Sequence, residues 1–256
     1  MTTFFVSADL GNTRLKLCTW EIQADASPRI QESVSLGTGD RVEAARAWLR
    51  TRACGVPIAL VSVAGVDAKR ALLQALQDIG PVSEPGHGLD VRCANPASVG
   101  LDRLFAARGA LAELGRDCIV VDAGTALTVD AVSAAEGGVF WGGSIAPGPD
   151  LLARSLASGA AQLPLVQPQV GAHAMGSDTE EAIRAGVGLG FRGAARELAA
   201  CLAREAGMEQ APVVLTGGAR AHLLEPQCVF AGECIELPEL VHIGLFAAAR
   251  PELKLP

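Results

Sequence analysis

The chain has 256 residues and a formal net charge of −7, and half of its residues are hydrophobic. The acidic balance argues against a nucleic-acid-binding surface, because such a surface needs clustered Lys and Arg. Aromatic residues are scarce and tyrosine is absent. The core must therefore be filled by Ala, Val, Leu and Ile, which is typical of α/β proteins. The length allows one large domain or two small ones.

Targeting signals and metal motifs are absent from the sequence. The first residues, MTTFFV, include no basic region, and Asp9 interrupts the apolar run, so we expect neither a signal peptide nor a membrane span. The seven cysteines form no C-x-x-C pair, and the four histidines are dispersed. We therefore expect a cytoplasmic protein with free thiols and no membrane partner.

The first part of the chain alternates strand and helix patterns. Residue periodicity predicts strands over 4–9 and 14–20, a helix over 42–54, a strand over 57–63, and helices over 69–79 and 101–114. A Gly-Asn turn joins the first two strands into a hairpin. Pro96 and Gly100 mark a bend before the last helix, which places Asp102 and Arg103 at its N-terminus. The helix dipole favours an anion there.

From Asp117 the pattern restarts with an apolar strand, a D-x-G-T turn and a second strand. Further strand pattern is expected around 138–146, and the Gly-Gly and Pro-Gly pairs of GGSIAPGPD predict a loop that opens into a helix. A capping box of Ser177 and Glu180 begins a long helix that reaches about Ala206. The remaining predicted elements are a strand over 212–215 and a closing helix over 239–250.

The stretches VSADLGNTRLKL and VVDAGTALTVD share one frame, in which Asp9 matches Asp122 and Gly11 matches Gly124. Two copies of one strand-turn-strand unit predict duplicated halves, 1–115 and 116–256, that face each other across a cleft. The predicted boundary lies near Gly115.

The first copy has the residues of a phosphate-binding turn. Gly11 lets the backbone approach a ligand closely, Asn12 and Thr13 can donate hydrogen bonds to phosphate oxygens, and Lys16 adds positive charge. Asp9, at the strand end, can hold a hydrated Mg²⁺ ion. The alternative is a plain hairpin with a surface lysine.

The second copy places another carboxylate, Asp122, on an apolar strand. An unpaired buried charge costs several kcal/mol by rough estimates, so this carboxylate needs a partner such as a cation. Alternatively, the aspartate caps its own turn. In SVGLDR, Asp102 can accept a proton from a hydroxyl that is being phosphorylated, and Arg103 can bind a carboxylate or phosphate. Alternatively, Asp102 is only stabilised by the helix dipole, and Arg103 lies in solvent.

The long helix contains Gly186, Gly188, Gly190 and Gly193, although each glycine costs up to about 1 kcal/mol relative to alanine. Such a run predicts close helix packing, and we expect a subunit interface there.

Taken together, the motifs resemble those of type III pantothenate kinases. The residues that carry the resemblance are Asp9-x-Gly11-Asn12-Thr13-x-x-Lys16, Asn95-Pro96, Gly100-x-Asp102-Arg103, Asp122-x-Gly124-Thr125-Ala126-x-Thr128-x-Asp130, Gly142-Gly143-x-Ile145-x-Pro147-Gly148 and Thr216-Gly217-Gly218. The resemblance implies two ribonuclease H-like halves, as in the acetate and sugar kinase, Hsc70 and actin superfamily. It also implies the phosphorylation of pantothenate by ATP, the first step of coenzyme A biosynthesis, in a homodimer formed through helix 179–206.

The resemblance also implies roles for particular residues. The ATP-binding residues would be Asp9, Leu10, Gly11, Asn12, Thr13, Arg14, Leu15, Lys16 and Thr125. The pantothenate site would include Gly100, Leu101, Asp102, Arg103, Thr179 and, more weakly, Cys93. Asp102 would accept the hydroxyl proton, Asp122 would bind K⁺ or NH4⁺, and Asp9 would hold Mg²⁺ through water.

One position departs from the family pattern. The family usually has a tyrosine two residues before Asn-Pro, where this chain has Cys93. The lost aromatic ring and hydroxyl can weaken pantothenate binding or mark a non-catalytic regulator of the Bvg accessory factor type. A kinase of the same superfamily that acts on another hydroxyl, and a structural α/β domain without nucleotide binding, are further alternatives.

Overall fold

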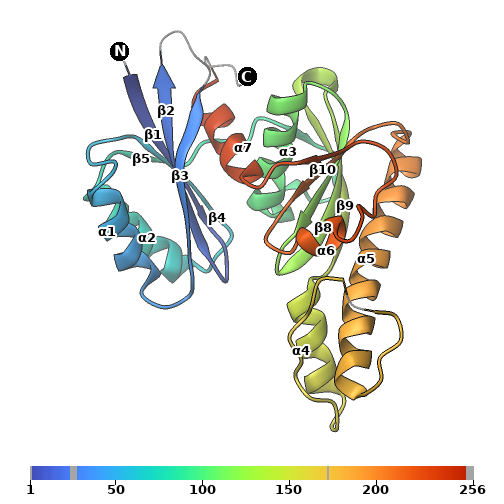
Figure 1. The fold of residues 1–256 in the computed structure, drawn as a ribbon. Coiled ribbons are helices and arrows are strands. Elements are labelled where there is room, and N and C mark those ends of the chain that lie inside the picture. The colour runs from blue at the N-terminus through green and yellow to red at the C-terminus, as the bar shows by residue number, and fades with distance from the viewer. Residues whose placement is uncertain (1, 24–27, 172, 252–256) are drawn as a thin grey trace. The chain divides into compact units, whose positions relative to one another are not determined.

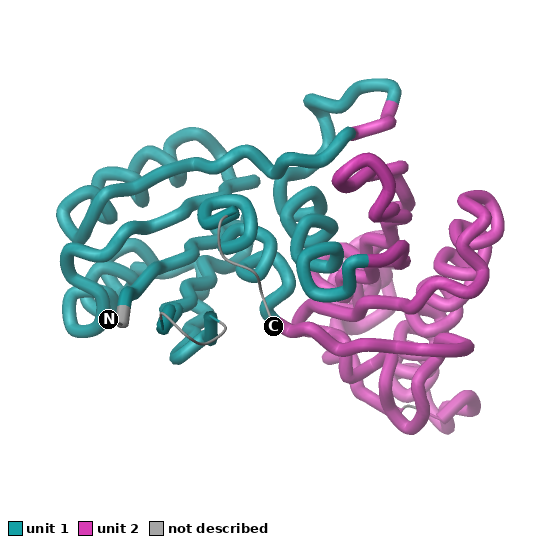
Figure 2. The backbone as a smooth tube through the Cα atoms, turned by 90° about the horizontal axis from the view of Figure 1, so that it is seen from above, with its two compact units in different colours: residues 1–90, 94–115, 239–256 teal, residues 91–93, 116–238 magenta. Residues whose placement is uncertain are grey.

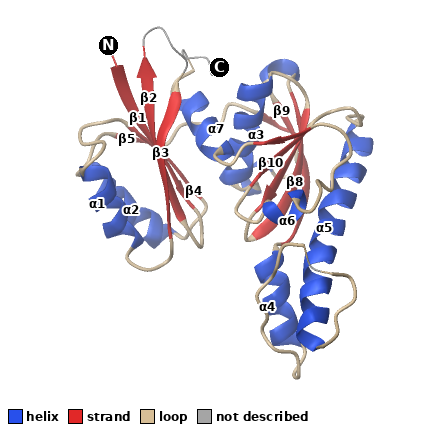
Figure 3. Cartoon of the chain, viewed as in Figure 1, coloured by secondary structure: helices blue, strands red, loops and turns tan. Residues whose placement is uncertain are grey.

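The computed structural model describes residues 2–23, 28–171 and 173–251. The chain forms two compact units (Figure 2). Unit 1 comprises residues 1–90, 94–115 and 239–256, and unit 2 comprises residues 91–93 and 116–238. Each unit contains one β-sheet flanked by helices (Figure 3).

The sheet of unit 1 has the strand order β3-β2-β1-β4-β5. The elements of this unit are β1 (Thr2–Leu10), β2 (Leu15–Gln23), β3 (Arg29–Leu36), α1 (Arg41–Arg50), β4 (Ile58–Ser62), α2 (Val66–Gln77), β5 (Val82–Ser83), a 3-10 turn (Pro96–Ser98), α3 (Leu101–Leu114) and α7 (Leu240–Ala249) (Figure 1). β1 pairs antiparallel with β2 and parallel with β4. The predicted hairpin is confirmed, and the Gly11 amide donates to the Arg14 carbonyl at 2.9 Å across its turn.

The sheet of unit 2 has the strand order β11-β10-β7-β8-β9-β6. Its elements are β6 (Asp90–Val91), β7 (Cys118–Ala123), β8 (Ala126–Ser133), a 3-10 turn (Ala135–Gly137), β9 (Val139–Pro147), α4 (Pro149–Gly159), α5 (Thr179–Ala206), β10 (Val213–Thr216), α6 (Ala221–Leu224) and β11 (Cys234–Glu236). The first residue of β6, Asp90, is the last residue of segment 1–90 of unit 1. Apart from edge strand β6, the order and directions repeat those of unit 1. This repeat confirms the predicted α/β fold with duplicated ribonuclease H-like halves.

Among the elements that the sequence predicted, three details differ in the structure. The Gly-Gly stretch predicted as a loop lies inside β9, because Gly143 packs against the backbone of Val129 on β8. The N-cap of α5 is Asp178 rather than Ser177, and its side chain accepts the Glu181 amide at 2.8 Å. The closing helix α7, which a boundary near Gly115 assigns to the second half, belongs to unit 1.

Helix α7 joins unit 1 because it packs on α3 and on the sheet. A Cβ atom at Gly244 would collide with the Phe105 carbonyl, and one at Gly109 would lie 2.9 Å from the Gly244 nitrogen, so the two backbones touch. On its other side, the Phe246 ring stacks on Trp20, with ring centroids 4.5 Å apart. The two glycines thus set the distance between α3 and α7.

All seven cysteines are free thiols. Among the described residues, no helix combines the length and the apolar character needed to cross a membrane.

The helix contact generates a stability prediction. Gly244→Ala should lower the free energy of unfolding by roughly 1–3 kcal/mol, because the added methyl overpacks against the α3 backbone. Urea unfolding followed by circular dichroism measures this change. Gly159→Ala is the matched control, because Gly159 is an exposed helical residue where a Cβ meets nothing within 4 Å. Equal stability of the two variants would contradict the assigned contact.

Candidate active site

Asp9 lies next to the last residue of β1, directly opposite Lys16 on β2 and beside Val61 on the parallel strand β4. Its side chain is half-buried, whereas Asn12 and Thr13 of the following turn are exposed. The hairpin therefore holds a carboxylate and an ammonium group at the base of a turn whose polar side chains face solvent. This arrangement suits the binding of a hydrated cation and phosphate oxygens.

Arg41 supports the same turn, although the sequence reasoning did not identify it. From the first position of α1, its guanidinium donates to the Gly11 carbonyl at 3.2 Å and to the Asn12 carbonyl at 3.5 Å. These two hydrogen bonds connect the start of α1 to the turn. The only sequence signal was a basic residue at the start of a predicted helix, which gives no indication of this contact.

Asp102 is the second residue of α3, after the N-cap Gly100, as the sequence predicted. Its Oδ1 atom accepts the Arg103 amide at 2.9 Å. A Cβ atom at Gly100 would lie only 2.5 Å from the same oxygen, so the carboxylate folds back over the glycine. Within the described chain, Oδ2 of Asp102 has no hydrogen-bond partner. The residue thus offers one positioned carboxylate oxygen at a helix N-terminus.

Asp122 occupies the corresponding place in unit 2, next to the last residue of β7 and beside Thr216 on β10. Two glycines enclose its carboxylate. A Cβ at Gly124 would lie 3.3 Å from Oδ1, and one at Gly217 would collide with the same atom. Gly217 also has a φ of 95°, which favours glycine. The close approach of these backbones leaves the carboxylate in a narrow setting that fits a small cation.

Thr125 follows this carboxylate in an exposed turn next to the N-terminus of α4. The Gly148 amide donates to the Thr125 carbonyl at 3.0 Å, and a Cβ at Gly148 would lie 2.7 Å from that oxygen. Pro149 begins the helix, where the missing N–H costs nothing. The positive end of the α4 dipole therefore lies beside the D-x-G-T turn and favours an anion there.

Cys93 and Thr179 complete the set of predicted residues. Cys93 is half-buried, and its Sγ atom lies 3.3 Å from the Cβ position of Gly142, which has a φ of 104°. Thr179 is exposed at the first position of α5. Unit 2 therefore contains Cys93, Asp122, Thr125 and Thr179, and unit 1 contains the 9–16 and 100–103 segments.

Comparison with known proteins assigns the family. The model of the family "Type III pantothenate kinase" matches residues 5–200. This chain belongs to the type III pantothenate kinase family. A type III pantothenate kinase of Akkermansia muciniphila is 32% identical over 214 residues, which cover 84% of this chain and 86% of that protein. One of Aromatoleum aromaticum is 35% identical over 228 residues, which cover 85% and 87%.

These matches confirm the resemblance inferred from the motifs and the expectation of a phosphotransferase family. Among solved structures, the chain is similar to an Aquifex aeolicus member of the Ppx/GppA protein family, with a TM-score of 0.40 and 15% identity over 85% of this chain and 67% of that one.

The setting of Asp122 in this family member generates a prediction for two adjacent glycines. Gly217→Ala should lower the free energy of unfolding by about 1–2 kcal/mol or more, because alanine is strained at this φ and its methyl displaces the Asp122 carboxylate. Gly218→Ala is the matched control, since a Cβ there meets nothing within 4 Å. Urea unfolding of both variants measures the difference in the free energy of unfolding. An equal effect at the two positions would exclude the tight enclosure of the Asp122 carboxylate.

Proposed function

We propose that this chain transfers the γ-phosphoryl group of ATP to the primary hydroxyl of pantothenate and so produces 4′-phosphopantothenate and ADP, the first step of coenzyme A biosynthesis. The observation that supports this function best is the carboxylate of Asp102, which is held at the N-terminus of α3 by the Arg103 amide. Family membership supports the choice of pantothenate as substrate.

In the proposed reaction, Oδ2 of Asp102 accepts the hydroxyl proton as the pantothenate oxygen attacks the γ-phosphorus. The bond between that phosphorus and the β,γ-bridging oxygen breaks, and ADP leaves. The Arg103 amide fixes the orientation of the carboxylate through Oδ1. Phosphoryl transfer depends mainly on positioning and charge stabilisation, so the oriented base only accepts the proton, and other groups must hold the phosphates.

The phosphate groups of ATP would bind the segment from Asp9 to Lys16. The exposed side chains of Asn12 and Thr13 and the Lys16 ammonium supply donors and positive charge. Arg41 keeps the turn in place through the Gly11 and Asn12 carbonyls. When bound, Mg²⁺ would neutralise charge on the phosphate oxygens, and Asp9 would hold it through water.

In unit 2, Thr125 would contact ATP beside the N-terminus of α4, and Asp122 would bind a monovalent cation, K⁺ or NH4⁺. The fit of the cation rests on the enclosure of one carboxylate by Gly124 and Gly217. The charge of the Asp122 carboxylate equals that needed to balance a monovalent cation.

Pantothenate would contact Gly100, Leu101, Arg103, Thr179 and Cys93. The Arg103 guanidinium can bind the pantothenate carboxylate through two hydrogen bonds. Cys93 is smaller than the family's usual tyrosine and would leave part of the proposed site unfilled, which would weaken the binding of pantothenate.

Cys93 also supports a second candidate, a nucleotide-binding regulator without kinase activity. ATP binding without turnover of pantothenate would favour this candidate. A screen of other hydroxyl substrates for ADP release would reveal a kinase of different specificity.

The role of Asp102 generates a catalytic prediction. Asp102→Asn should lower kcat by about 100-fold or more, because the amide cannot accept the proton, while the fold stays intact. The measurement is ADP release with pantothenate, ATP, Mg²⁺ and K⁺, together with circular dichroism.

Asp67→Asn is the matched control for this experiment. Asp67 is likewise the second residue of a helix, α2, whose N-cap is Gly65. Its kcat should stay at the wild-type value. Full activity of the Asp102→Asn protein would remove the assigned base, and an equal loss in both variants would indicate a general helix effect.

We further propose that α5 forms the interface of a homodimer. Gly186 and Gly190 are exposed on this helix, and a Cβ at either position meets nothing within 4 Å. Leu189, between them, is 41% exposed. Other exposed apolar side chains of β9, α4 and the following segment are Ile145, Leu151, Leu156, Leu165 and Met175. A second copy would cover an apolar surface of this kind.

The proposed interface generates a prediction on oligomeric state. Gly190→Glu should convert a dimer to a monomer, because the interface would bury like charges from both copies. Size-exclusion chromatography with light scattering measures the mass. Ala200→Glu, at an exposed position of the same helix away from the glycines, should leave the dimer intact. A wild-type protein with the mass of one chain would refute the proposal.

A further inference from the structure

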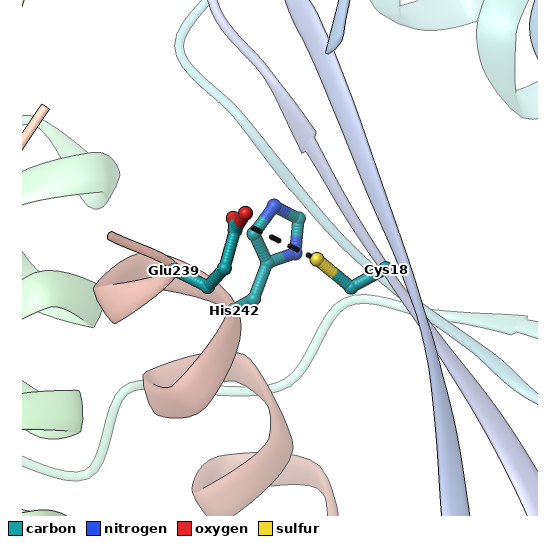
Figure 4. Close-up of side chains that lie close together, drawn as sticks. All are labelled: Cys18, Glu239 and His242. Atoms are coloured by element: carbon teal, nitrogen blue, oxygen red, sulfur yellow. Dashed lines mark hydrogen bonds between the residues drawn. The ribbon is translucent and has the colours of Figure 1, made fainter. Parts of the chain in front are cut away.

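Unit 1 contains a cluster of three potential metal ligands on α7 and β2. Cys18 comes from β2, Glu239 is the N-cap of α7, and His242 is the third residue of that helix. One donor atom of each lies within 4.8 Å of the donors of the other two (Figure 4). This cluster contains no residue assigned to the proposed kinase reaction.

The spacing of the thiol and the carboxylate matches that of two ligands on one metal ion. The Sγ atom of Cys18 lies 3.7 Å from Oε2 of Glu239. Zn–S and Zn–O bonds of about 2.3 and 2.1 Å in a tetrahedral site place the two ligand atoms roughly 3.6 Å apart. The pair therefore needs little movement to share an ion, and a ring nitrogen of His242 lies within 4.8 Å of both atoms.

The imidazole of His242 adds an independent observation. The ring is 1% exposed, and its Nδ1 atom lies 2.8 Å from Oγ of Ser7, which also accepts the Trp20 indole N–H at 2.8 Å. Within the described chain, the Nε2 atom is buried without a hydrogen-bond partner.

A nitrogen left unpaired in a core costs about 1–3 kcal/mol. If Nδ1–H donates to Ser7, the lone pair of Nε2 is available for a metal, and Ser7 acts as the outer partner that commonly orients a ligating histidine. Metal binding would thus use the one ring atom that the protein leaves unsatisfied.

We propose that Cys18, Glu239 and His242 bind one Zn²⁺ ion that fastens α7 to the β1–β2 hairpin. Thiolate, imidazole and carboxylate form a mixed S, N and O set that suits zinc. The thiolate and carboxylate balance its two charges, although the Lys16 ammonium on the same face of β2 opposes the cation. Glu239 is only half-buried and provides an approach from solvent, and water can fill the fourth position.

The site would lie two residue pairs along the hairpin from the proposed phosphate-binding residues. Ser7 pairs directly with Cys18, and Asp9 pairs directly with Lys16. Side chains two apart on a strand point to the same face, so both pairs face the same side of the hairpin. Zinc would stabilise the hairpin and α7 without taking part in phosphoryl transfer.

The test is a titration of the full chain, stripped by a chelator, with Zn²⁺ alone and then with Co²⁺ alone, in the absence of ATP. We expect one ion per chain by calorimetry, a thiolate-to-cobalt charge-transfer band, and a higher Tm with zinc. Cys18→Ser should remove the band, and Glu239→Gln should weaken binding at least tenfold. An absence of stoichiometric binding, or an unchanged band in Cys18→Ser, would overturn the proposal.

Two controls separate this site from other thiols and from folding defects. Cys118→Ser replaces an equally buried thiol on β7, and Cys228→Ser replaces an exposed one, so both should retain the zinc stoichiometry and the band. If Cys18→Ser does not fold, the zinc affinity of Glu239→Gln is the deciding measurement. An unchanged zinc affinity of this variant would refute the site. Asp102→Asn should bind zinc normally, so failure of the kinase proposal and failure of the zinc proposal give different results.

Discussion

The position of Asp102 depends on the backbone contact between Gly109 of α3 and Gly244 of α7. No side chain larger than hydrogen fits at Gly244, because its Cβ would occupy the place of the Phe105 carbonyl. Helix α7 is in turn fixed to the sheet by Phe246, whose ring packs on Trp20 and, edge to face, on Phe5. Helix α7 therefore links α3, which carries the proposed base, to the two strands that flank the proposed phosphate-binding turn.

The duplicated sheets give Asp9 and Asp122 equivalent places, but their surroundings differ. After Asp9, the turn closes from Gly11 to Arg14 and exposes side-chain donors, whereas the turn after Asp122 closes from Gly124 to Ala126. Gly217 then encloses the Asp122 carboxylate. An open turn suits a large, hydrated ligand such as a metal-bound phosphate, and an enclosed carboxylate suits a small ion. Duplication followed by local change can thus separate two roles within one fold.

Local patterns in the sequence predicted the features that depend on neighbouring residues. The hairpin at Gly11, the D-x-G-T turn at Asp122 and the helix start at Asp102 each follow from a few adjacent residue types, and the structure has them where they were expected. The edge strand β3 was missed because polar Glu32 interrupts the alternation of apolar residues in RIQESVSL, where only Ile30, Val34 and Leu36 are partly buried. The structure positions the candidate site residues, while their chemical roles remain predictions.

Features set by contacts between distant segments could not be predicted in this way. Gly143 belongs to a strand because β8 lies against it, and Arg41 contacts Gly11 only after α1 has folded beside the hairpin. The assignment of α7 to unit 1 has the same origin. Gly244 contacts Gly109, although most of unit 2 lies between them in the sequence. Glycine pairs and single arginines do not specify such partners by themselves.

His242 is the one polar side chain in α7, whose sequence is otherwise apolar. A purely structural role explains the contact of its Nδ1 atom with Ser7 and the accompanying bond from Trp20, but it leaves Nε2 unsatisfied. The Cys18 thiol also faces a carboxylate at the start of the same helix, to which it donates a hydrogen bond across 3.7 Å. A metal ion accounts for all three groups at once, because each provides a ligand atom. It would also strengthen the same junction of α7 with β1 and β2 that the aromatic contacts already hold.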